Sequence, residues 1–170
     1  SIGKSGERKS YIETLRGFLK NNLNELSEES KKRIETNALR ILDSKNPIDR
    51  KITEDAPKIL DHLGVESKSR FENVINELTR LGVNYEIDFR LVRGLDYYTD
   101  TTFEFISEDL GAQDAIGGGG RYDGLIELLG GKPTSGVGFG SGMERILMVA
   151  EKSGFAFPAP SKPKIYFIAL

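Results

Sequence analysis

The first half of the chain places its apolar residues at the spacing of an α-helix. A helix is predicted over about residues 7–20, and Ser27 is a suitable N-cap for a second helix that reaches Leu42. The Asn46-Pro47 pair breaks the helical pattern after that point. The apolar stripe of the first helix consists of Tyr11, Leu15, Phe18 and Leu19. This part of the chain is therefore predicted to be a small helical bundle.

Two further helices are predicted before residue 85. Thr53, followed by two acidic residues, resembles a helix start, and Gly64 ends the apolar pattern after it. The clearest helix opens with the capping box Ser69-x-x-Glu72 and closes at Gly82. It carries one apolar stripe, formed by Phe71, Val74, Ile75, Leu78 and Leu81. Taken alone, this helical part is also compatible with a purely structural bundle that does no chemistry.

The apolar period changes from helical spacing to strict alternation at Tyr85. Residues 85–91 alternate apolar and charged side chains, which predicts a half-buried strand. Further strands are predicted at about residues 101–106, 114–116 and 136–140, with a short helix at 125–129 and a longer one from Ser141. Because the connections between consecutive strands are short, the sheet is predicted to be antiparallel.

Glycine is unevenly distributed along the chain. Residues 1–89 contain 5 of the 19 glycines, and residues 90–170 contain the other 14. A charged helical part is therefore expected to precede a glycine-rich sheet part. Three prolines at positions 158, 160 and 163 indicate a stiff linker, and residues 164–170 are expected to begin another domain. Because the chain starts without methionine and ends on an apolar run, we expect it to be a piece of a longer protein.

The composition excludes several classes of protein. The 170 residues are 38% apolar and 29% charged, which is typical of a folded domain rather than of a disordered chain. Without cysteine, disulfide scaffolds and cysteine-bound metal centres are excluded. No apolar stretch approaches the roughly 20 residues of a membrane helix. A net charge of −2 provides no general basic surface, so any RNA contact is expected to be local.

The segment RGLDYY at residues 93–98 carries side chains that a sheet does not need. The planar guanidinium of Arg93 suits a carboxylate or a phosphate, because burial of an arginine is costly without an anion. Tyr97 and Tyr98 are expected to point to opposite faces of a strand, so that only one or two hydroxyls line a cavity. The alternative is that Arg93 pairs with Asp96 or another carboxylate and that the tyrosines belong to the core.

A run of four glycines at residues 117–120 precedes Arg121. Glycine allows positive φ angles and a close approach of a ligand to the backbone. A β-bulge or a tight turn without any ligand is the alternative. The run lacks the spacing of a dinucleotide-binding motif, and no P-loop lysine follows it, so these two kinds of nucleotide site are excluded.

Glycines alternate with other residues from Gly136 to Gly142, just before Glu144 and Arg145. This alternation would leave one face of a strand bare, so that a flat ligand could lie on it. Arg145, in the first turn of the following helix, could stack on a base or pair with a phosphate beside the free amides of that turn. Close packing of a helix on the sheet is the alternative.

Taken together, these segments resemble the signatures of the histidyl-tRNA synthetases, a family of class II aminoacyl-tRNA synthetases. LVRGLDYYT at residues 91–99 is similar to the first histidine-specific signature, and GGGRYDG at residues 118–124 is similar to the second. Residues 136–145 are similar to class II motif 3. ETNALRILDSK at residues 35–45 resembles the helical insertion of the family, although many members have proline where this chain has Ala38.

The resemblance implies an α+β fold, in which a helical insertion module precedes part of the antiparallel-sheet class II synthetase catalytic domain. The insertion domain would span residues 1–84, with residues 1–3 forming the end of a catalytic-domain strand. Residues 85–155 would be the catalytic-domain portion, and residues 156–170 would be a linker and the first strand of the anticodon-binding domain. Motifs 1 and 2 would precede residue 1, so the chain alone is expected to be inactive.

The resemblance also implies a reaction and a set of site residues. ATP and histidine would form histidyl-adenylate and pyrophosphate, and the histidyl group would then pass to tRNA(His). Arg93 would be catalytic, contacting the histidine carboxylate and the α-phosphate. The histidine-binding residues would be Arg93, Tyr97, Tyr98, Gly119, Gly120 and Tyr122. The ATP-binding residues would be Arg93, Gly140, Gly142 and Arg145.

The partners implied by the resemblance are L-histidine, ATP and the acceptor stem of tRNA(His), in a cytoplasmic homodimer without membrane contact. ATP would arrive with Mg²⁺ as a substrate, and no tightly bound cofactor or protein metal site is implied. One alternative is the histidine-binding regulatory subunit of ATP phosphoribosyltransferase, which usually lacks both the signature arginine and the helical insertion. Another is a helical interaction module fused to a vestigial nucleotide-binding sheet.

Overall fold

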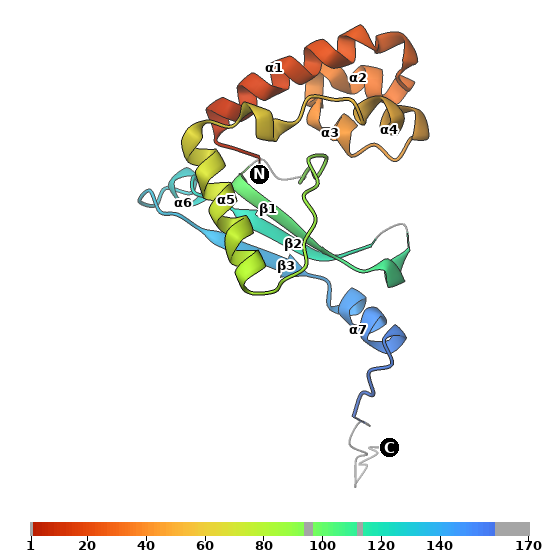
Figure 1. Ribbon diagram of the computed structural model, residues 1–170, viewed down its shortest axis with the longest axis vertical. Helices are drawn as coiled ribbons and strands as arrows, with labels where there is room; N and C mark the ends of the chain where they lie inside the picture. The colour runs from red at the N-terminus through yellow and green to blue at the C-terminus, as the bar shows by residue number, and fades with distance from the viewer. Residues whose placement is uncertain (1, 94–96, 112–113, 159–170) are drawn as a thin grey trace, which may run out of the picture.

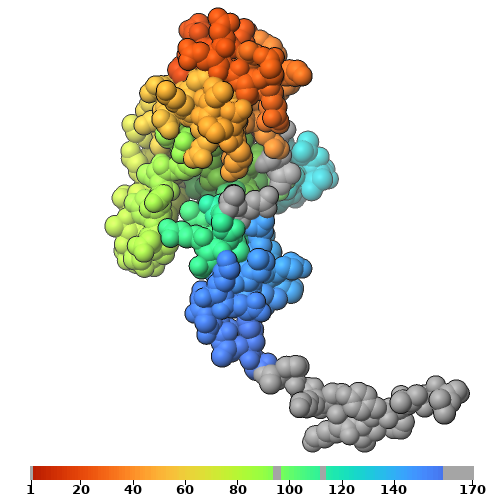
Figure 2. Space-filling model, turned by 90° about the vertical axis from the view of Figure 1, so that its right-hand side faces the viewer, coloured from red at the N-terminus to blue at the C-terminus, as the bar shows by residue number. Residues whose placement is uncertain are grey.

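A computed structural model describes residues 2–93, 97–111 and 114–158 of the chain. Figure 1 shows a helical unit at one end, an antiparallel sheet in the middle and helix α7 at the other end, and Figure 2 shows the same order from the side. The α+β fold predicted from the sequence is confirmed. The α-helices are α1 (Ser5–Asn21), α2 (Glu28–Asn37), α3 (Leu39–Leu42), α4 (Pro47–Thr53), α5 (Val65–Arg80), α6 (Leu125–Leu128) and α7 (Met143–Lys152). The 3₁₀ helices are η1 (Leu23–Glu25), η2 (Ile59–His62) and η3 (Glu108–Leu110), and the strands are β1 (Thr99–Ile106), β2 (Ala115–Arg121) and β3 (Val137–Ser141).

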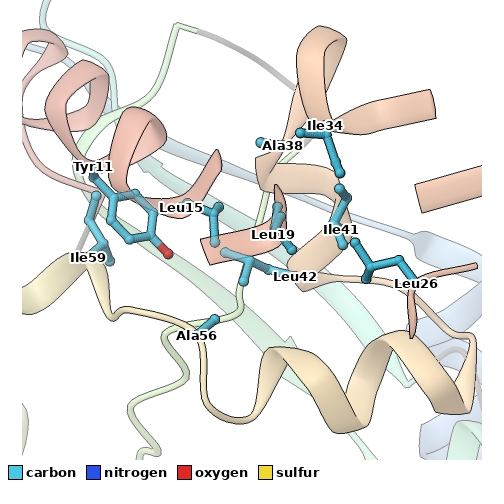
Figure 3. Close-up of a cluster of buried hydrophobic side chains, with 10 residues drawn as sticks. All are labelled: Tyr11, Leu15, Leu19, Leu26, Ile34, Ala38, Ile41, Leu42, Ala56 and Ile59. Carbon is cyan, nitrogen blue, oxygen red and sulfur yellow. The ribbon is translucent and has the colours of Figure 1, made fainter. Parts of the chain in front are cut away.

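The apolar core lies in the helical unit, which comprises α1 to α4 with η1 and η2 (Figure 3). The stripe predicted for α1 is buried at Tyr11, Leu15 and Leu19, each at most 1% exposed. The Tyr11 hydroxyl donates to the carbonyl of Pro57 at 2.9 Å, and burial raises its pKa to about 12. Burial of one such side chain contributes about 1.5–3 kcal/mol, so these three residues of α1 contribute substantially to the stability of this unit.

A buried carboxylate ties three helices of the helical unit together. Asp49 in α4 is 1% exposed and accepts hydrogen bonds from the amide and the hydroxyl of Ser27, at 2.9 and 2.7 Å. The hydroxyls of Ser30 and Ser44 also donate to it, at 2.7 and 2.8 Å. Burial alone would raise the pKa of Asp49, but these four hydrogen bonds hold it below its ordinary value.

The sheet has the strand order β1-β2-β3, and both pairings are antiparallel, as the short connections predicted. The glycine run at residues 117–120 forms the middle of the central strand β2 rather than a turn. Gly118 lies opposite Glu104 of β1 and Gly140 of β3, and Gly120 lies opposite Gly138. The tight turn considered from the sequence is therefore wrong for this run, whereas the pairing of β1 with β2 does shift register at both of its ends.

The strand predicted at residues 85–91 does not form. No strand of the described chain pairs with this segment, and an alternating sequence becomes a strand only where a neighbour takes its backbone hydrogen bonds. Its apolar residues Tyr85 and Ile87 are 40% and 50% exposed, and Phe89 instead lies beneath the ammonium group of Lys58, 5.0 Å from its ring centroid.

Two helix boundaries differ from the predicted ones. Thr53 ends α4 instead of starting a helix, and η2 follows at residues 59–62. Helix α5 begins at Val65, four residues before the predicted cap, although Gly82 closes it with a φ of +67° as expected. A contact from α1 replaces the local cap, because Glu7 accepts from the Gly64 amide and the Ser67 hydroxyl, both at 2.7 Å.

Within the described part of the chain, no helix combines the length and apolar character needed to cross a membrane. The last predicted strand, at residues 164–170, lies outside the described residues, as do Pro160 and Pro163.

Candidate functional site

The register of the sheet separates a bare face from an aromatic face. Side chains alternate along each strand and cross-strand partners share a face. One face therefore carries four glycines with no side chains, which we call the glycine strip: Gly118, Gly120, Gly138 and Gly140. The opposite face carries Phe103, Phe105 and Phe139, whose neighbouring ring centroids are 5.3 and 6.0 Å apart. Strands β2 and β3 thus offer backbone on one side, bordered by Thr102 and Glu104 of β1, and the sheet carries aromatic rings on the other.

The ring of Tyr122 lies against the glycines of β3 and its approach. A Cβ on Gly136 would lie 2.4 Å from Cε2 of this ring, and a Cβ on Gly138 would lie 2.7 Å from its hydroxyl. Both distances are shorter than any real contact, so the alternating glycines are required for the ring to occupy this position. This face of β3 has no side chains of its own, as the sequence predicted, but the Tyr122 ring covers it at Gly136 and Gly138, so a flat ligand could lie on it only beyond that ring.

Three tyrosines gather at this end of the glycine strip. The ring of Tyr97 lies 4.8 Å from that of Tyr98 and 6.0 Å from that of Tyr122, measured between centroids. They line a cavity of about 360 Å³, here called the tyrosine cavity, whose size suits a small-molecule ligand. Its lining residues are Tyr97, Tyr98, Tyr122, Leu125, Gly138, Phe139 and Gly140.

The expectation that Tyr97 and Tyr98 point to opposite faces is wrong, because both side chains line this cavity. They precede β1, which begins at Thr99, so strand alternation does not govern them. Burial and the neighbouring Tyr98 hydroxyl raise the pKa of Tyr97. Its phenol therefore stays protonated at neutral pH and can donate a hydrogen bond to a ligand.

Arg93 lies over the middle of the glycine strip. A Cβ on Gly118 would lie 2.9 Å from Nη1 of Arg93, and this Nη1 donates to a carboxylate oxygen of Glu104. The two side chains are 25% and 24% exposed. The carboxylate partner weighed from the sequence is thus Glu104, whereas Asp96 lies outside the described residues. Nε of Arg93 is buried and has no partner among the described residues, so the guanidinium retains donor capacity for an anion.

Arg145 marks the other end of the site. It lies in the first turn of α7, and its Nη1 donates to the carbonyl of Ala115 at 3.2 Å. Ala115 is the first residue of β2, three positions before Gly118, while Arg121 ends the strand three positions after it. Three residues of a strand span about 10 Å. Arg145 and Arg93 therefore contact β2 at positions three residues apart, and the tyrosine cavity begins at the end of β2 marked by Tyr122 and reaches Gly138 and Gly140 of β3.

The remaining predicted glycines hold different places. Gly119 lies opposite Phe139 and so belongs to the aromatic face by its register, unlike the four glycines of the strip. Gly142 precedes α7, and its amide donates to the carbonyl of Ile116 at 2.9 Å. Glu104 is the residue of this site that sequence reasoning did not single out, because an outward-facing glutamate in a strand is ordinary.

No group of three or more histidine, cysteine, aspartate or glutamate side chains suited to a metal ion occurs in the described part of the chain.

Comparison with known proteins gives a consistent result. The sequence profile of the family described as histidyl-tRNA synthetase matches residues 4–146. The chain is 47% identical over its whole length to a histidine–tRNA ligase of Acetivibrio thermocellus, of which it covers 41%. It is 48% identical to the histidine–tRNA ligase of Saccharopolyspora erythraea, of which it covers 40%.

A solved structure agrees with these sequence relatives. The crystal structure of apo Staphylococcus aureus histidyl-tRNA synthetase superimposes with a TM-score of 0.65 at 36% identity, covering 92% of this chain and 38% of that one. The chain therefore spans about two fifths of the length of the relatives it matches.

Proposed function

The chain belongs to the histidyl-tRNA synthetase family, and from this premise we propose that it supplies the histidine pocket and part of the ATP site of a histidine–tRNA ligase. In the first step of the proposed reaction, the histidine carboxylate attacks the α-phosphorus of ATP. Histidyl-adenylate forms and pyrophosphate leaves. In the second step the histidyl group passes to tRNA(His).

The observation that carries this proposal is the order of groups along β2. Phenol hydroxyls lie at one end, a guanidinium lies over the middle of the strip, and a second guanidinium lies at the far end. Histidyl-adenylate has the same order of parts, with an imidazole, a phosphate and an adenosine. A flat, side-chain-free strip lets such an extended molecule lie along the backbone.

Arg93 is the proposed catalytic residue. Negative charge on the α-phosphate increases as the carboxylate attacks, and a guanidinium already fixed beside that point stabilises the transition state more than the ground state. Glu104 would hold Arg93 in place before the substrates bind. The histidine carboxylate and the phosphate would then take up the remaining donors of Arg93.

The tyrosine cavity is the proposed imidazole pocket. The hydroxyl of Tyr97, Tyr98 or Tyr122 can donate to a ring nitrogen, and the neighbouring rings would exclude water. The histidine-binding set would be completed by backbone of Gly119 and Gly120. Such a site favours an imidazole over an apolar side chain, since a buried phenol would otherwise lose its partner.

Arg145, together with Gly140 and Gly142, is proposed to bind ATP. The guanidinium can pair with a phosphate or stack on the adenine. Mg²⁺ would arrive with ATP as part of the substrate. The helical unit is proposed to lie near the acceptor stem of tRNA(His), and the full-length protein is proposed to be a cytoplasmic homodimer. We retain the division into parts at residues 1–84, 85–155 and 156–170 as part of this proposal.

The proposal is tested by histidine-dependent exchange of pyrophosphate into ATP, using the full-length protein. We expect the wild type to catalyse exchange and Arg93→Ala to lose at least about a hundredfold, because one preorganised donor contributes about that factor. Arg90→Ala is the control, because Arg90 precedes Arg93 by three residues in the chain and its guanidinium is ion-paired with Asp88. Histidine binding without exchange in the wild type would instead favour the regulatory paralogue.

A further inference from the structure

Four charged side chains meet where helix α5 crosses the sheet beside β1 (Figure 1). Nη1 of Arg70, on α5, donates to Oδ2 of Asp100 at 2.8 Å and lies 3.8 Å from Oδ2 of Asp123. Nε of Arg121, at the end of β2, donates to Oδ2 of Asp123 at 2.7 Å and lies 4.0 Å from Oδ2 of Asp100. Two guanidinium groups thus bridge two carboxylates, and we call these four residues the junction network.

The junction network holds a strained segment of backbone. Asp100 is 3% exposed and has a φ of +51°, the only positive value outside glycine in the described residues. Such a conformation costs on the order of 1–3 kcal/mol and persists only where its surroundings fix it. The pairing of β1 with β2 shifts register between Thr99 and Thr102, around this residue. Backbone hydrogen bonds to Gly3 and Ile2, at 3.0 and 2.6 Å, hold Asp100 from the other side.

The same residues are joined to the tyrosine cavity through short stretches of chain. Tyr98 precedes Asp100 by two residues, and Tyr122 lies between Arg121 and Asp123. The Asp123 amide donates to the Thr99 hydroxyl at 3.3 Å, which links the two tyrosine-bearing segments directly. A movement of the two carboxylates would therefore displace rings on both sides of the cavity.

We propose that Arg70 is a positioning residue for histidine binding, through which helix α5 sets the relative position of the tyrosine segments. The proposal rests on the assignment of the tyrosine cavity to histidine. Arg70 itself belongs to the helical part of the chain and lines no part of the cavity. Its effect is thus expected on the affinity for histidine and not on that for ATP, whose proposed site lies toward Arg145.

The test compares Arg70→Met with Arg80→Met in the full-length protein by pyrophosphate exchange. Arg80 is a matched control on the same helix, because it pairs with Glu77 at the surface, where the two side chains are 68% and 61% exposed. We expect Arg70→Met to raise the KM for histidine about tenfold and to change the KM for ATP by less than about twofold. Arg80→Met should leave both constants at the wild-type values. A general structural effect would instead change both constants, or kcat, together.

A histidine KM of Arg70→Met equal to that of the control would overturn the proposal. If Arg70→Met does not fold, as shown by thermal unfolding, Arg70→Lys replaces it. A lysine keeps the charge but lacks the planar fork with which Arg70 holds Asp100 through Nη1 and Glu66 through Nη2, so a rise of about threefold is expected and an unchanged KM contradicts the proposal. If the wild type shows no exchange, the proposed function fails, and calorimetric titration with histidine then decides the role of Arg70 separately.

Discussion

The side chain of Asp49 connects α2, α3 and α4 in the helical unit, because it accepts hydrogen bonds from three serines in and beside these helices. The carboxylate is buried, and hydrogen bonds from serine hydroxyls and a backbone amide stabilise its charge. An arrangement of this kind is sensitive to protonation, because the hydroxyl and amide donors are directed toward an ionised acceptor.

We predict that this carboxylate makes the stability of the protein depend on pH. Its pKa is lower in the folded than in the unfolded chain, so the unfolded state binds more protons. The free energy of unfolding should therefore fall as the pH drops below about 5 and continue to fall through the folded pKa. Asp49→Asn should lower stability by about 1–3 kcal/mol at pH 7 and weaken this acid dependence. Urea denaturation from pH 7 to pH 3 measures both effects.

The control for this prediction is Asp43→Asn, since that side chain is 52% exposed in the same helical unit. It should change the free energy of unfolding by less than about 0.5 kcal/mol. If the Asp49→Asn protein is as stable as the control and keeps the acid dependence of the wild type, the hydrogen bonds from the three serines to Asp49 contribute little to stability.

At the scale of the elements, the sequence correctly predicted the helix features that depend on interactions between residues close together in the chain. The stripe of Tyr11, Leu15 and Leu19 and the glycine that closes α5 act within a few residues of chain, and both appear as predicted. The start of α5 depends on Glu7, some sixty residues away, so no local pattern could place it. The segment at residues 85–91 has the alternation of a strand but lacks a pairing neighbour in the described chain.

The residues of the site also fall into those that the sequence predicted and those that only the folded structure brings together. The glycine alternation and the Arg93 and Arg145 positions carry a chemical meaning in sequence, and the structure arranges them along one strand. Glu104 and the junction network depend on side chains brought together by register and by the crossing of α5. Asp100 also has a φ of +51°, a conformation that the presence of an aspartate in a strand does not predict.

At the level of strand β3, we predict that Gly138→Ala will impair histidine binding. The new methyl group would lie 2.7 Å from the Tyr122 hydroxyl, so the ring must move out of its place in the cavity wall. The KM for histidine should rise about tenfold in pyrophosphate exchange. Gly124→Ala is the matched control, because no atom lies within 4 Å of a Cβ there. Equal KM values for the two variants would mean that the position of Tyr122 does not matter.

On the scale of the whole molecule, helix α5 connects the helical unit with the sheet. Its first turn is anchored to α1 through Glu7, and its second turn reaches β1 through Arg70. The guanidinium of Arg8 on α1 also donates to the carbonyl of Tyr98 at 2.7 Å. Helices α1 and α5 therefore form direct hydrogen bonds with the segments that carry the tyrosines of the cavity.

We predict that the 170-residue chain alone will not catalyse histidine-dependent pyrophosphate exchange. It spans about two fifths of its relatives, and its proposed ATP site contains only two arginines, Arg93 over β2 and Arg145 in α7. The full-length protein at equal concentration is the positive control, and circular dichroism shows whether the isolated chain is folded. Exchange above background by the folded chain would show that these residues form a complete activation site.

The glycine strip also has a thermodynamic consequence. Glycine loses more conformational freedom on folding than alanine does, at a cost of about 0.5–1 kcal/mol per residue, so four such positions cost about 2–4 kcal/mol. The strip is accordingly a part of the sheet whose folding costs more free energy than that of a strand with side chains. A molecule lying on the strip would supply the contacts that side chains provide elsewhere, and substrate binding would stiffen the strand that receives it.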